Sequence, residues 1–260
     1  MGDTEATDLM VGALTDPFDD CHMGVTAENV AAKWDVSREA QDELAVRSHQ
    51  RAAAAIAGGR FAEQIVPVTV AGRKQTVTFD TDEGVRADAD PAAMARLRPV
   101  FDASGTVTAG NAASINDAAA AVVLMTRATA ERRGLAPLGR LVAYGFAGVE
   151  PRFMGVGPTP AIRQALERAG LGIGDLDVIE LNEAFAAQAI AVARDLELPE
   201  DKLNPNGSGI SLGHPVGATG CILTVKALYE LARTGGRHAL VSMCIGGGQG
   251  IAAVFEREAA

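Results

Sequence analysis

The residues of this sequence best suited to chemistry are a histidine and a cysteine, each in a glycine-rich segment. His214 lies in residues 206–215, which read Asn-Gly-Ser-Gly-Ile-Ser-Leu-Gly-His-Pro, and Cys244 is followed by Ile245 and three glycines, 246–248. Glycine leaves room for a small reacting centre, and free amides in such a loop can stabilise a thiolate or an enolate oxygen. His214 therefore suits a general base or hydrogen-bond donor, and Cys244 suits a stabilised thiolate.

Each candidate also has a purely structural interpretation. His214 could be a loop histidine satisfied by carbonyl groups, and Cys244 a buried cysteine at a strand end. Asn182 follows a predicted strand and precedes a helix, so it could cap that helix or hold a water against a developing oxyanion. The glycines at 207, 209 and 213 have the wrong spacing for a dinucleotide-binding loop. No Cys-x-x-Cys or His-x-x-x-His pair exists, so we predict no metal site.

Composition narrows the class of protein. A formal net charge of −10 argues against nucleic acid as a partner. No apolar run approaches the ~20 residues of a membrane span, and the acidic first residues do not form a signal peptide. The three cysteines Cys21, Cys221 and Cys244 are too few and scattered for a disulfide framework. We therefore expect a reduced, cytoplasmic protein without membrane segments.

The elements that must position these residues alternate between strand and helix from residue 139 onward. The patterns predict strands at 141–144, 178–181, 239–243 and 251–255, and helices at 159–169, 183–196 and 218–234. Such alternation implies an α/β domain in which helices pack on a sheet.

The preceding half of the chain is less regular in its pattern. Residues 1–35 are expected to be irregular, with a short helix capped by Thr26, and Ser37 is expected to cap a helix ending near residue 57. Two strands, 65–70 and 75–79, are predicted around a connection at 71–74, and turns dominate 80–115. Residues 118–133 read as an apolar helix or strand plus helix, too long to leave exposed. His49 and His238 are expected at the surface.

Three segments together resemble the active-site signature of the thiolase family. They are Asn-Glu-Ala-Phe at 182–185, Gly-His-Pro at 213–215 and Cys-Ile-Gly-Gly-Gly at 244–248, in the family's order and at similar separations. Residues 22–29, 105–111 and 154–158 also match. The resemblance covers essentially all 260 residues and is strongest to bacterial beta-ketothiolases of broad chain length. Thiolases make or break the carbon–carbon bond of 3-ketoacyl-CoA.

The resemblance implies a role for each reactive group. His214 would take the proton of the family's acyl-accepting cysteine, and Cys244 would exchange a proton with the methyl carbon of acetyl-CoA. Asn182 would position a water that, with His214, forms one oxyanion hole, and the amide of Gly246 would contribute to the other. Acetyl-CoA and 3-ketoacyl-CoA would be the substrates, with coenzyme A as substrate or product and no further cofactor.

The resemblance also implies a set of coenzyme A contacts. Arg86 would lie near the nucleotide, although it could equally form a surface pair with Asp88 or Asp90. Ser114 would supply a polar contact that Ala113, where relatives often have serine, cannot make. Ala118 likewise replaces a common glycine. The pantetheine tunnel would be lined by His22, Met23, Phe101, Ala109, Met154 and Phe185, of which Met154 and Phe185 could also be plain core.

The family's acyl-accepting cysteine, in a Cys-x-Ser-Gly setting, does not occur in this sequence, and the surroundings of Cys21 differ from it. We therefore expect a thiolase-like chain without roughly the family's first third and inactive alone. The alternative is a non-catalytic CoA-binding or interaction protein on the same scaffold; a ketoacyl synthase relative is disfavoured, because those enzymes lack this cysteine motif.

The resemblance also implies an organisation of the chain. Residues 1–115 would form a loop domain over coenzyme A, residues 116–136 would return to an N-terminal domain, and residues 137–260 would form the C-terminal α/β domain. The intact protein would be a homodimer or homotetramer.

Overall fold

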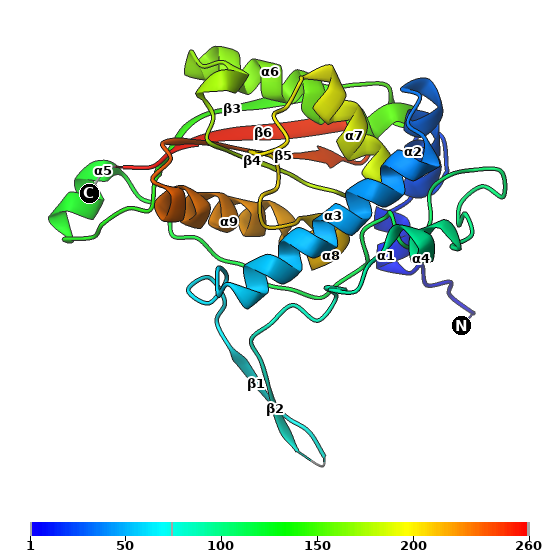
Figure 1. The fold of residues 1–260 in the computed structure, drawn as a ribbon, viewed down its shortest axis with the longest axis horizontal. Coiled ribbons are helices and arrows are strands. Elements are labelled where there is room, and N and C mark those ends of the chain that lie inside the picture. The colour runs from blue at the N-terminus through cyan, green and yellow to red at the C-terminus, as the bar shows by residue number, and fades with distance from the viewer. Residues whose placement is uncertain (1, 74, 259–260) are drawn as a thin grey trace.

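A four-stranded sheet organises the molecule (Figure 1). The computed structural model describes residues 2–73 and 75–258. The strands lie in the order β3 (Arg140–Gly148), β6 (Gln249–Glu256), β5 (His238–Ile245) and β4 (Val178–Leu181). β4 and β5 run parallel, whereas β6 is antiparallel to both of its neighbours. The four strands predicted from the alternating pattern are confirmed, with β3, β5 and β6 longer than predicted.

Helices cover both faces of this sheet. α6 (Pro158–Ala169) packs on β3 and β6, and α9 (Thr219–Thr234) packs on β4 and β5 from the opposite face. α7 (Ala186–Asp195) continues the layer of α6, and two 3-10 turns, η1 (Pro151–Val156) and η2 (Ile173–Asp175), lie in the connections. Side chains between the layers, such as Ile179, Leu181 and Leu240, are fully buried. The predicted C-terminal α/β fold is therefore confirmed.

One long helix, α3 (Arg38–Ala57), connects the N-terminal half of the chain to the helices around the sheet. It contacts α7, α8 (Gly209–Leu212) and α4 (Pro91–Ala95). Its predicted cap is confirmed, because the Ser37 hydroxyl accepts a hydrogen bond of 3.2 Å from the Ala40 amide. Through its contact with α8, α3 therefore packs beside the loop that carries His214.

The first 35 residues are more helical than expected. They contain α1 (Leu9–Ala13) and α2 (Met23–Lys33). The predicted cap at Thr26 is wrong, since α2 begins at Met23 and the Nδ1 atom of His22 accepts the Gly24 amide at 3.0 Å. A histidine ring replaces the usual hydroxyl cap here, which composition alone did not indicate.

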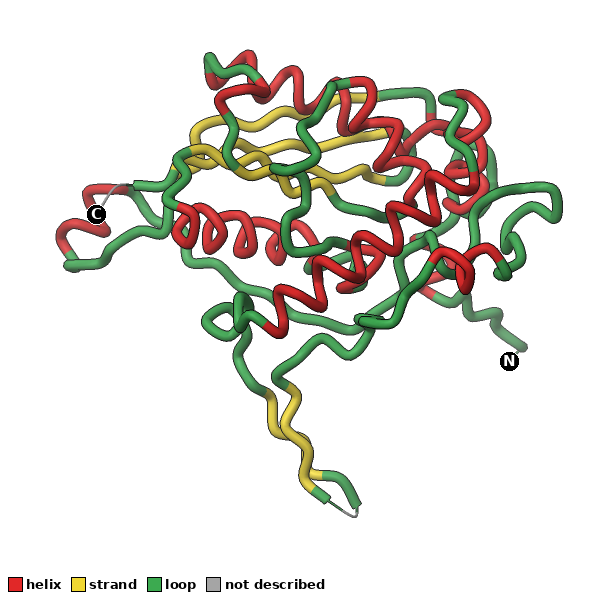
Figure 2. Tube along the Cα trace, viewed as in Figure 1, coloured by secondary structure: helices red, strands yellow, loops and turns green. Residues whose placement is uncertain are grey.

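A hairpin projects from the body of the protein (Figures 1 and 2). It consists of β1 (Val68–Ala71) and β2 (Thr76–Phe79), which pair antiparallel and are exposed along their length. Both predicted strands are confirmed, though shorter, and Lys74 of the predicted connection lies outside the described residues.

The prediction for residues 118–133 is wrong for residues 118–126 and confirmed only for a short helix at the end of the segment. The segment up to residue 126 has no regular structure, and helix forms only in α5 (Arg127–Arg132). Val123 and Leu124 are 84% and 83% exposed instead of buried. No layer formed by the described residues covers this apolar run.

Candidate active site

His214 is held at the junction of two helices. α8 ends at Leu212 and is followed by Gly213, whose φ of +91° favours glycine, and α9 begins at Thr219. A β-carbon at residue 213 would lie 2.3 Å from Oδ1 of Asn116. The His214 amide donates to that same oxygen at 3.2 Å and to the Ser114 carbonyl at 3.3 Å. Residues 114–116 thus fix the backbone on which the imidazole is mounted.

The partner of the His214 ring indicates which nitrogen is free to act as a base. Nδ1 of His214 lies 2.7 Å from the Thr219 hydroxyl, which itself donates to the Pro215 carbonyl at 2.9 Å. A hydroxyl has one proton, so the assignment that satisfies both bonds has Nδ1–H donating and leaves Nε2 unprotonated. Burial lowers the pKa of His214, which keeps the ring neutral near pH 7.

Cys244 is buried in an apolar cluster at the end of β5. Met23, Met154 and Phe185 belong to the same cluster. Burial raises the pKa of the Cys244 thiol to about 11. The thiol is therefore protonated near neutral pH, and its thiolate, once formed, is a stronger base than that of an ordinary cysteine.

The glycines after Cys244 make a tight connection from β5 to β6. Gly247 and Gly248 have φ of +78° and +82°, a backbone region that other residues avoid. A β-carbon at Gly246 would lie 2.7 Å from the terminal methyl of Met23. The absence of side chains thus lets α2 approach the backbone beside Cys244.

Asn182 provides the most unusual polar group of the site. Its side chain is fully buried, yet neither Oδ1 nor Nδ2 has a hydrogen-bond partner among the described residues. Such a group costs about 1–3 kcal/mol unless water or a ligand satisfies it. The helix-cap interpretation of Asn182 is wrong, because α7 begins after Phe185. The amide is available for a bound molecule.

The sheet brings Asn182 and Cys244 to one edge. Asn182 directly follows β4, and its backbone N–H donates to the Ser242 carbonyl of β5 at 2.9 Å. Because β4 and β5 are parallel, Asn182 and Cys244 lie at the same carboxyl edge. Gly209, at the start of α8, approaches so closely that a β-carbon there would lie 2.7 Å from Oδ1 of Asn182. The His214 loop therefore packs on the same edge.

The buried carboxyl group of Glu183 connects this edge to α3 and to Asn204. Glu183 accepts hydrogen bonds from the Ser48 hydroxyl at 2.6 Å and from Nδ2 of Asn204 at 3.0 Å. The Ser48 hydroxyl also lies 2.8 Å from that of Ser211 in α8. Burial raises the pKa of Glu183. Thr219, Ser48 and Asn204 were not predicted as site residues. The partners of Ser48 and Asn204 are distant in sequence, and the contact of Thr219 with His214 depends on the direction of its side chain.

The predicted tunnel residues divide into two groups. Met23, Met154 and Phe185 cluster with Cys244, with Phe101 packed against them. The His22 ring stacks on Phe101 at a centroid distance of 4.7 Å, and Phe101 meets Phe185 edge-on at 6.1 Å. The structure thus brings these residues to the thiol.

The remaining predicted contacts lie at the surface. Ala109, Ser114 and Arg86 are exposed and lie outside that cluster. Arg86 forms no ion pair with Asp88 or Asp90 within the described part of the chain, so the alternative of a surface pair is not observed. Its guanidinium is free to meet a ligand.

Two other histidines were expected at the surface. The structure buries one of them and leaves the other only partly exposed. His49 is only 5% exposed, so that prediction is wrong, and the side chain of His238 is 14% exposed. α3 buries polar residues such as Asp42 and Ser48 beside its apolar ones, so residue type alone did not indicate that His49 is buried.

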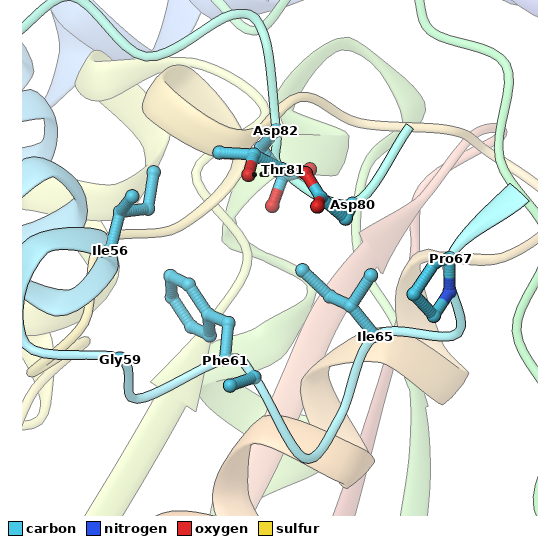
Figure 3. Close-up of a pocket in the computed structure, with 9 residues that line it drawn as sticks. Ile56, Gly59, Phe61, Ile65, Pro67, Asp80, Thr81 and Asp82 are labelled. Atoms are coloured by element: carbon cyan, nitrogen blue, oxygen red, sulfur yellow. Dashed lines mark hydrogen bonds between the residues drawn. The ribbon is translucent and has the colours of Figure 1, made fainter. Parts of the chain in front are cut away.

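A second hollow lies away from the candidate active site. A cavity of about 320 Å³ lies at the base of the hairpin, between Ile56, Phe61 and Ile65 on one side and residues 80–82 on the other (Figure 3). It contains none of the predicted catalytic or coenzyme A residues. Over residues 2–73 and 75–258, no cluster of His, Cys, Asp or Glu is arranged to bind a metal ion. No helix in this part of the chain is long and apolar enough to cross a membrane.

Known proteins resemble the chain along its whole length. A model of the thiolase N-terminal domain matches residues 1–128, and one of the thiolase C-terminal domain matches residues 135–257. Beta-ketothiolase BktB of Cupriavidus necator is 67% identical over 258 residues, which are 99% of this chain and 66% of that protein. Acetyl-CoA acetyltransferase of Paracoccus denitrificans is 52% identical over the same coverage, 99% and 66%.

Solved structures share the fold. The acetyl-CoA acetyltransferase of Bacillus anthracis superposes with a TM-score of 0.95 at 46% identity, covering 99% of this chain and 66% of that one. Human mitochondrial 3-ketoacyl-CoA thiolase in complex with CoA superposes with a TM-score of 0.90 at 40% identity, covering 99% and 65%. The chain spans about two thirds of the length of these relatives, 65–66%. On these matches and its fold, the chain belongs to the thiolase family.

Proposed function

We propose that this chain carries the proton-transfer and coenzyme A-binding part of an acyl-CoA C-acetyltransferase. The reaction is the reversible Claisen condensation of acetyl-CoA with an acyl-CoA, or thiolysis of 3-ketoacyl-CoA in reverse. Support comes from the family, from the names of its relatives and from the geometry at the carboxyl edge of β4 and β5.

One observation carries the proposal more than any other. The buried amide of Asn182 has no partner among the described residues, and it lies on the edge that also bears Cys244 and the His214 loop. A preorganised donor that is unsatisfied in the free protein can bind an oxyanion, directly or through a water, without first breaking another bond. This is the group that an enolate or a tetrahedral intermediate requires.

The groups around this amide divide the proton chemistry. Cys244 in its thiolate form, the minor form near neutral pH, takes a proton from the methyl carbon of acetyl-CoA and becomes the thiol, and the electron pair of that C–H bond delocalises onto the thioester oxygen. A base of raised pKa favours this transfer, because a carbon acid is weak. Nε2 of His214 accepts or returns a proton on the reacting partner, and the amide of Gly246 can donate to developing charge.

The surroundings suit a thioester with a long apolar arm. Met23, Phe101, Met154 and Phe185 form an apolar lining beside Cys244, which excludes water from the carbanion. Exposed Arg86 offers one cation to the phosphates or the adenine of the nucleotide in an otherwise acidic protein.

A complete cycle also needs a cysteine that accepts the acyl group. Burial first, and then Asp16, Asp19 and Asp20, raise the pKa of Cys21, which makes it a poor nucleophile at neutral pH. We infer that the 260 residues alone perform the proton exchange but not thiolysis. The intact enzyme is proposed to be a homodimer or homotetramer.

Deuterium exchange into the methyl group of acetyl-CoA in D₂O, followed by mass spectrometry, tests the proton transfer without the missing nucleophile. The chain should accelerate exchange, and Cys244→Ala should lower the rate by about 10²-fold or more. Cys221→Ala replaces a half-buried cysteine that does not belong to the apolar cluster around Cys244; it is the matched control and should leave the rate unchanged. Coenzyme A binding without any exchange would instead favour a non-catalytic CoA-binding protein.

Thiolysis of acetoacetyl-CoA by free coenzyme A tests the second half of the inference. We expect no turnover by the 260-residue chain. Turnover that Cys244→Ala abolishes would show that an acyl-accepting nucleophile lies within these residues, contrary to the proposal.

A further inference from the structure

His49 occupies an unexpected position in the middle of α3. It is 5% exposed, and its Nδ1 atom accepts a hydrogen bond of 3.1 Å from the backbone amide of Arg86. An imidazole nitrogen that accepts from an amide must be unprotonated, so the ring proton is on Nε2. The bond joins residues 37 positions apart in the sequence.

The segment that contains Arg86 has little regular structure of its own. It lies between the end of β2 at residue 79 and the start of α4 at residue 91. A local turn bond runs from the Ala89 amide to the Arg86 carbonyl at 3.2 Å. Such a segment needs contacts to the body of the protein to hold one conformation. The bond to His49 supplies one from α3.

The same segment lies beside the loop of the catalytic histidine. A β-carbon built on Gly84 would be 3.6 Å from the carbonyl oxygen of Ser211 in α8, three residues before His214. Ser48, the neighbour of His49 in α3, meets the Ser211 hydroxyl at 2.8 Å. α3 therefore fixes the segment of Arg86 and the base of the His214 loop with two adjacent side chains.

We propose that His49 is a positioning residue for coenzyme A: its unprotonated Nδ1 fixes the backbone of Arg86 and thereby holds the exposed guanidinium where it meets the nucleotide. The inference rests on the proposed function, which makes coenzyme A the ligand. His49 itself touches no substrate and acts only through Arg86.

The surroundings of His49 keep its ring in the required neutral form. Burial and the positive charge of Arg86 lower the pKa of His49, whereas Asp88 acts in the opposite direction. A protonated ring would turn Nδ1 into a donor facing the Arg86 N–H, which would break the bond.

Isothermal titration of the chain with coenzyme A and with pantetheine tests this role, because pantetheine lacks the nucleotide. His49→Leu removes the acceptor, and His49→Asn keeps an oxygen close to the place of Nδ1. We expect His49→Leu to weaken coenzyme A binding about 5- to 10-fold, the equivalent of one hydrogen bond, and to leave pantetheine binding unchanged. His49→Asn should bind coenzyme A nearly as the unaltered chain does.

Arg86→Ala completes a double-mutant cycle. If His49 acts through Arg86, His49→Leu should have no further effect on coenzyme A binding once Arg86 is replaced. Should His49→Leu not fold, His49→Gln replaces it, since its amide oxygen extends one bond too far to accept from the Arg86 amide.

Three results would overturn the inference and leave the proposed function standing. The first is weaker binding with Arg86→Ala but not with His49→Leu, and the second is equal weakening of coenzyme A and pantetheine by His49→Leu. The third is no effect of Arg86→Ala on coenzyme A binding. Failure of the proposed function would show separately, as an absence of methyl deuterium exchange that depends on Cys244.

Discussion

Residues 178–181, apolar except for Glu180, and the apolar residues 122–125 are both short runs, yet they have opposite surroundings. In β4, Val178, Ile179 and Leu181 are at most 2% exposed, between paired strands and the helices on both faces. Val123 and Leu124 are 84% and 83% exposed and lie in a segment without regular structure. Hydrophobic sequence therefore predicts burial only where another layer is present to cover it.

The difference extends to the regions around each run. The edge of β4 and β5 is held together by hydrogen bonds from α3, α8 and α9, whereas the Asn182 side chain and Oε1 of Glu180 have no partner among the described residues. The apolar strip, which we define as Ile115, Val122, Val123 and Leu124, is bare, and on β3 Leu141, Tyr144 and Phe146 are also about half exposed. The first region is complete within the described chain, whereas the second has the character of an interface.

Self-association is the largest expected effect of this difference. We expect the chain to elute well above its monomeric mass in size-exclusion chromatography with light scattering, because the apolar strip is exposed. Val123→Asp combined with Leu124→Asp should shift it towards the monomer. Leu9→Asp alters an equally exposed but isolated residue, 84% exposed, and should not. A monodisperse unaltered monomer would contradict the interface assignment.

Two buried asparagines at the edge of β4 and β5 should have opposite effects on stability when each is replaced by alanine. Asn182→Ala should leave the melting temperature unchanged or higher, since its amide has no partner among the described residues, but slow methyl exchange about 10²-fold. Asn204→Ala should destabilise the fold by about 3 kcal/mol, because Asn204 bonds Leu181 twice and Glu183 once. Thermal unfolding and exchange rates measure both. A large destabilisation by Asn182→Ala would mean that its amide has a structural role.

The Thr219 hydroxyl is expected to determine which ring nitrogen of His214 carries the proton. Thr219→Val should free Nδ1 of His214 and mix the two ring tautomers, and exchange should slow about 10-fold. Thr219→Ser keeps the hydroxyl and should behave as the unaltered chain. Long-range ¹⁵N–¹H spectra report the tautomer directly, and with four histidines the assignment is simple. An Nε2-protonated His214 in the unaltered chain would refute the assignment.

The smallest expected effect is a pH dependence of stability. Burial raises the pKa of Glu183 in the folded state, so its favourable contribution is full below the unfolded pKa and is lost as pH rises through the folded value. Glu183→Gln should therefore gain stability relative to the unaltered chain as pH rises from about 4.5, by at most ~1.4 kcal/mol per pH unit. Urea unfolding at several pH values gives this difference. A difference that does not vary with pH would mean that Glu183 does not titrate as proposed.

Local pattern accounted for the elements that frame the site. β4 matches its prediction residue for residue, the cap at Ser37 was predicted from residue type, and α6 ends at the predicted residue 169, before Gly170 with φ of +67°. These features depend on neighbours within a few residues, so the sequence records them directly. The cap of α2 by His22 has no such signature and was missed.

Long-range contacts account for what the sequence left open. His49, expected at the surface, is buried because a segment 37 residues away folds over it. Thr219 follows His214 by about one helical turn, but only the packed structure shows that its hydroxyl meets the ring. The direction of a side chain is set by tertiary packing, which pattern alone does not specify.

The sequence by itself determined the family, the order of strands and helices after residue 139, and the residue types gathered around His214 and Cys244. Those properties reside in periodicity, glycine placement and short motifs, which are local. Only the tertiary structure decided that parallel pairing of β4 with β5 brings Asn182 to the edge of Cys244, that the Asn182 amide is left without a partner among the described residues, and that the apolar strip is uncovered. Each of these depends on which distant surface is available to satisfy a group, and burial and hydrogen bonding are properties of the whole packed chain.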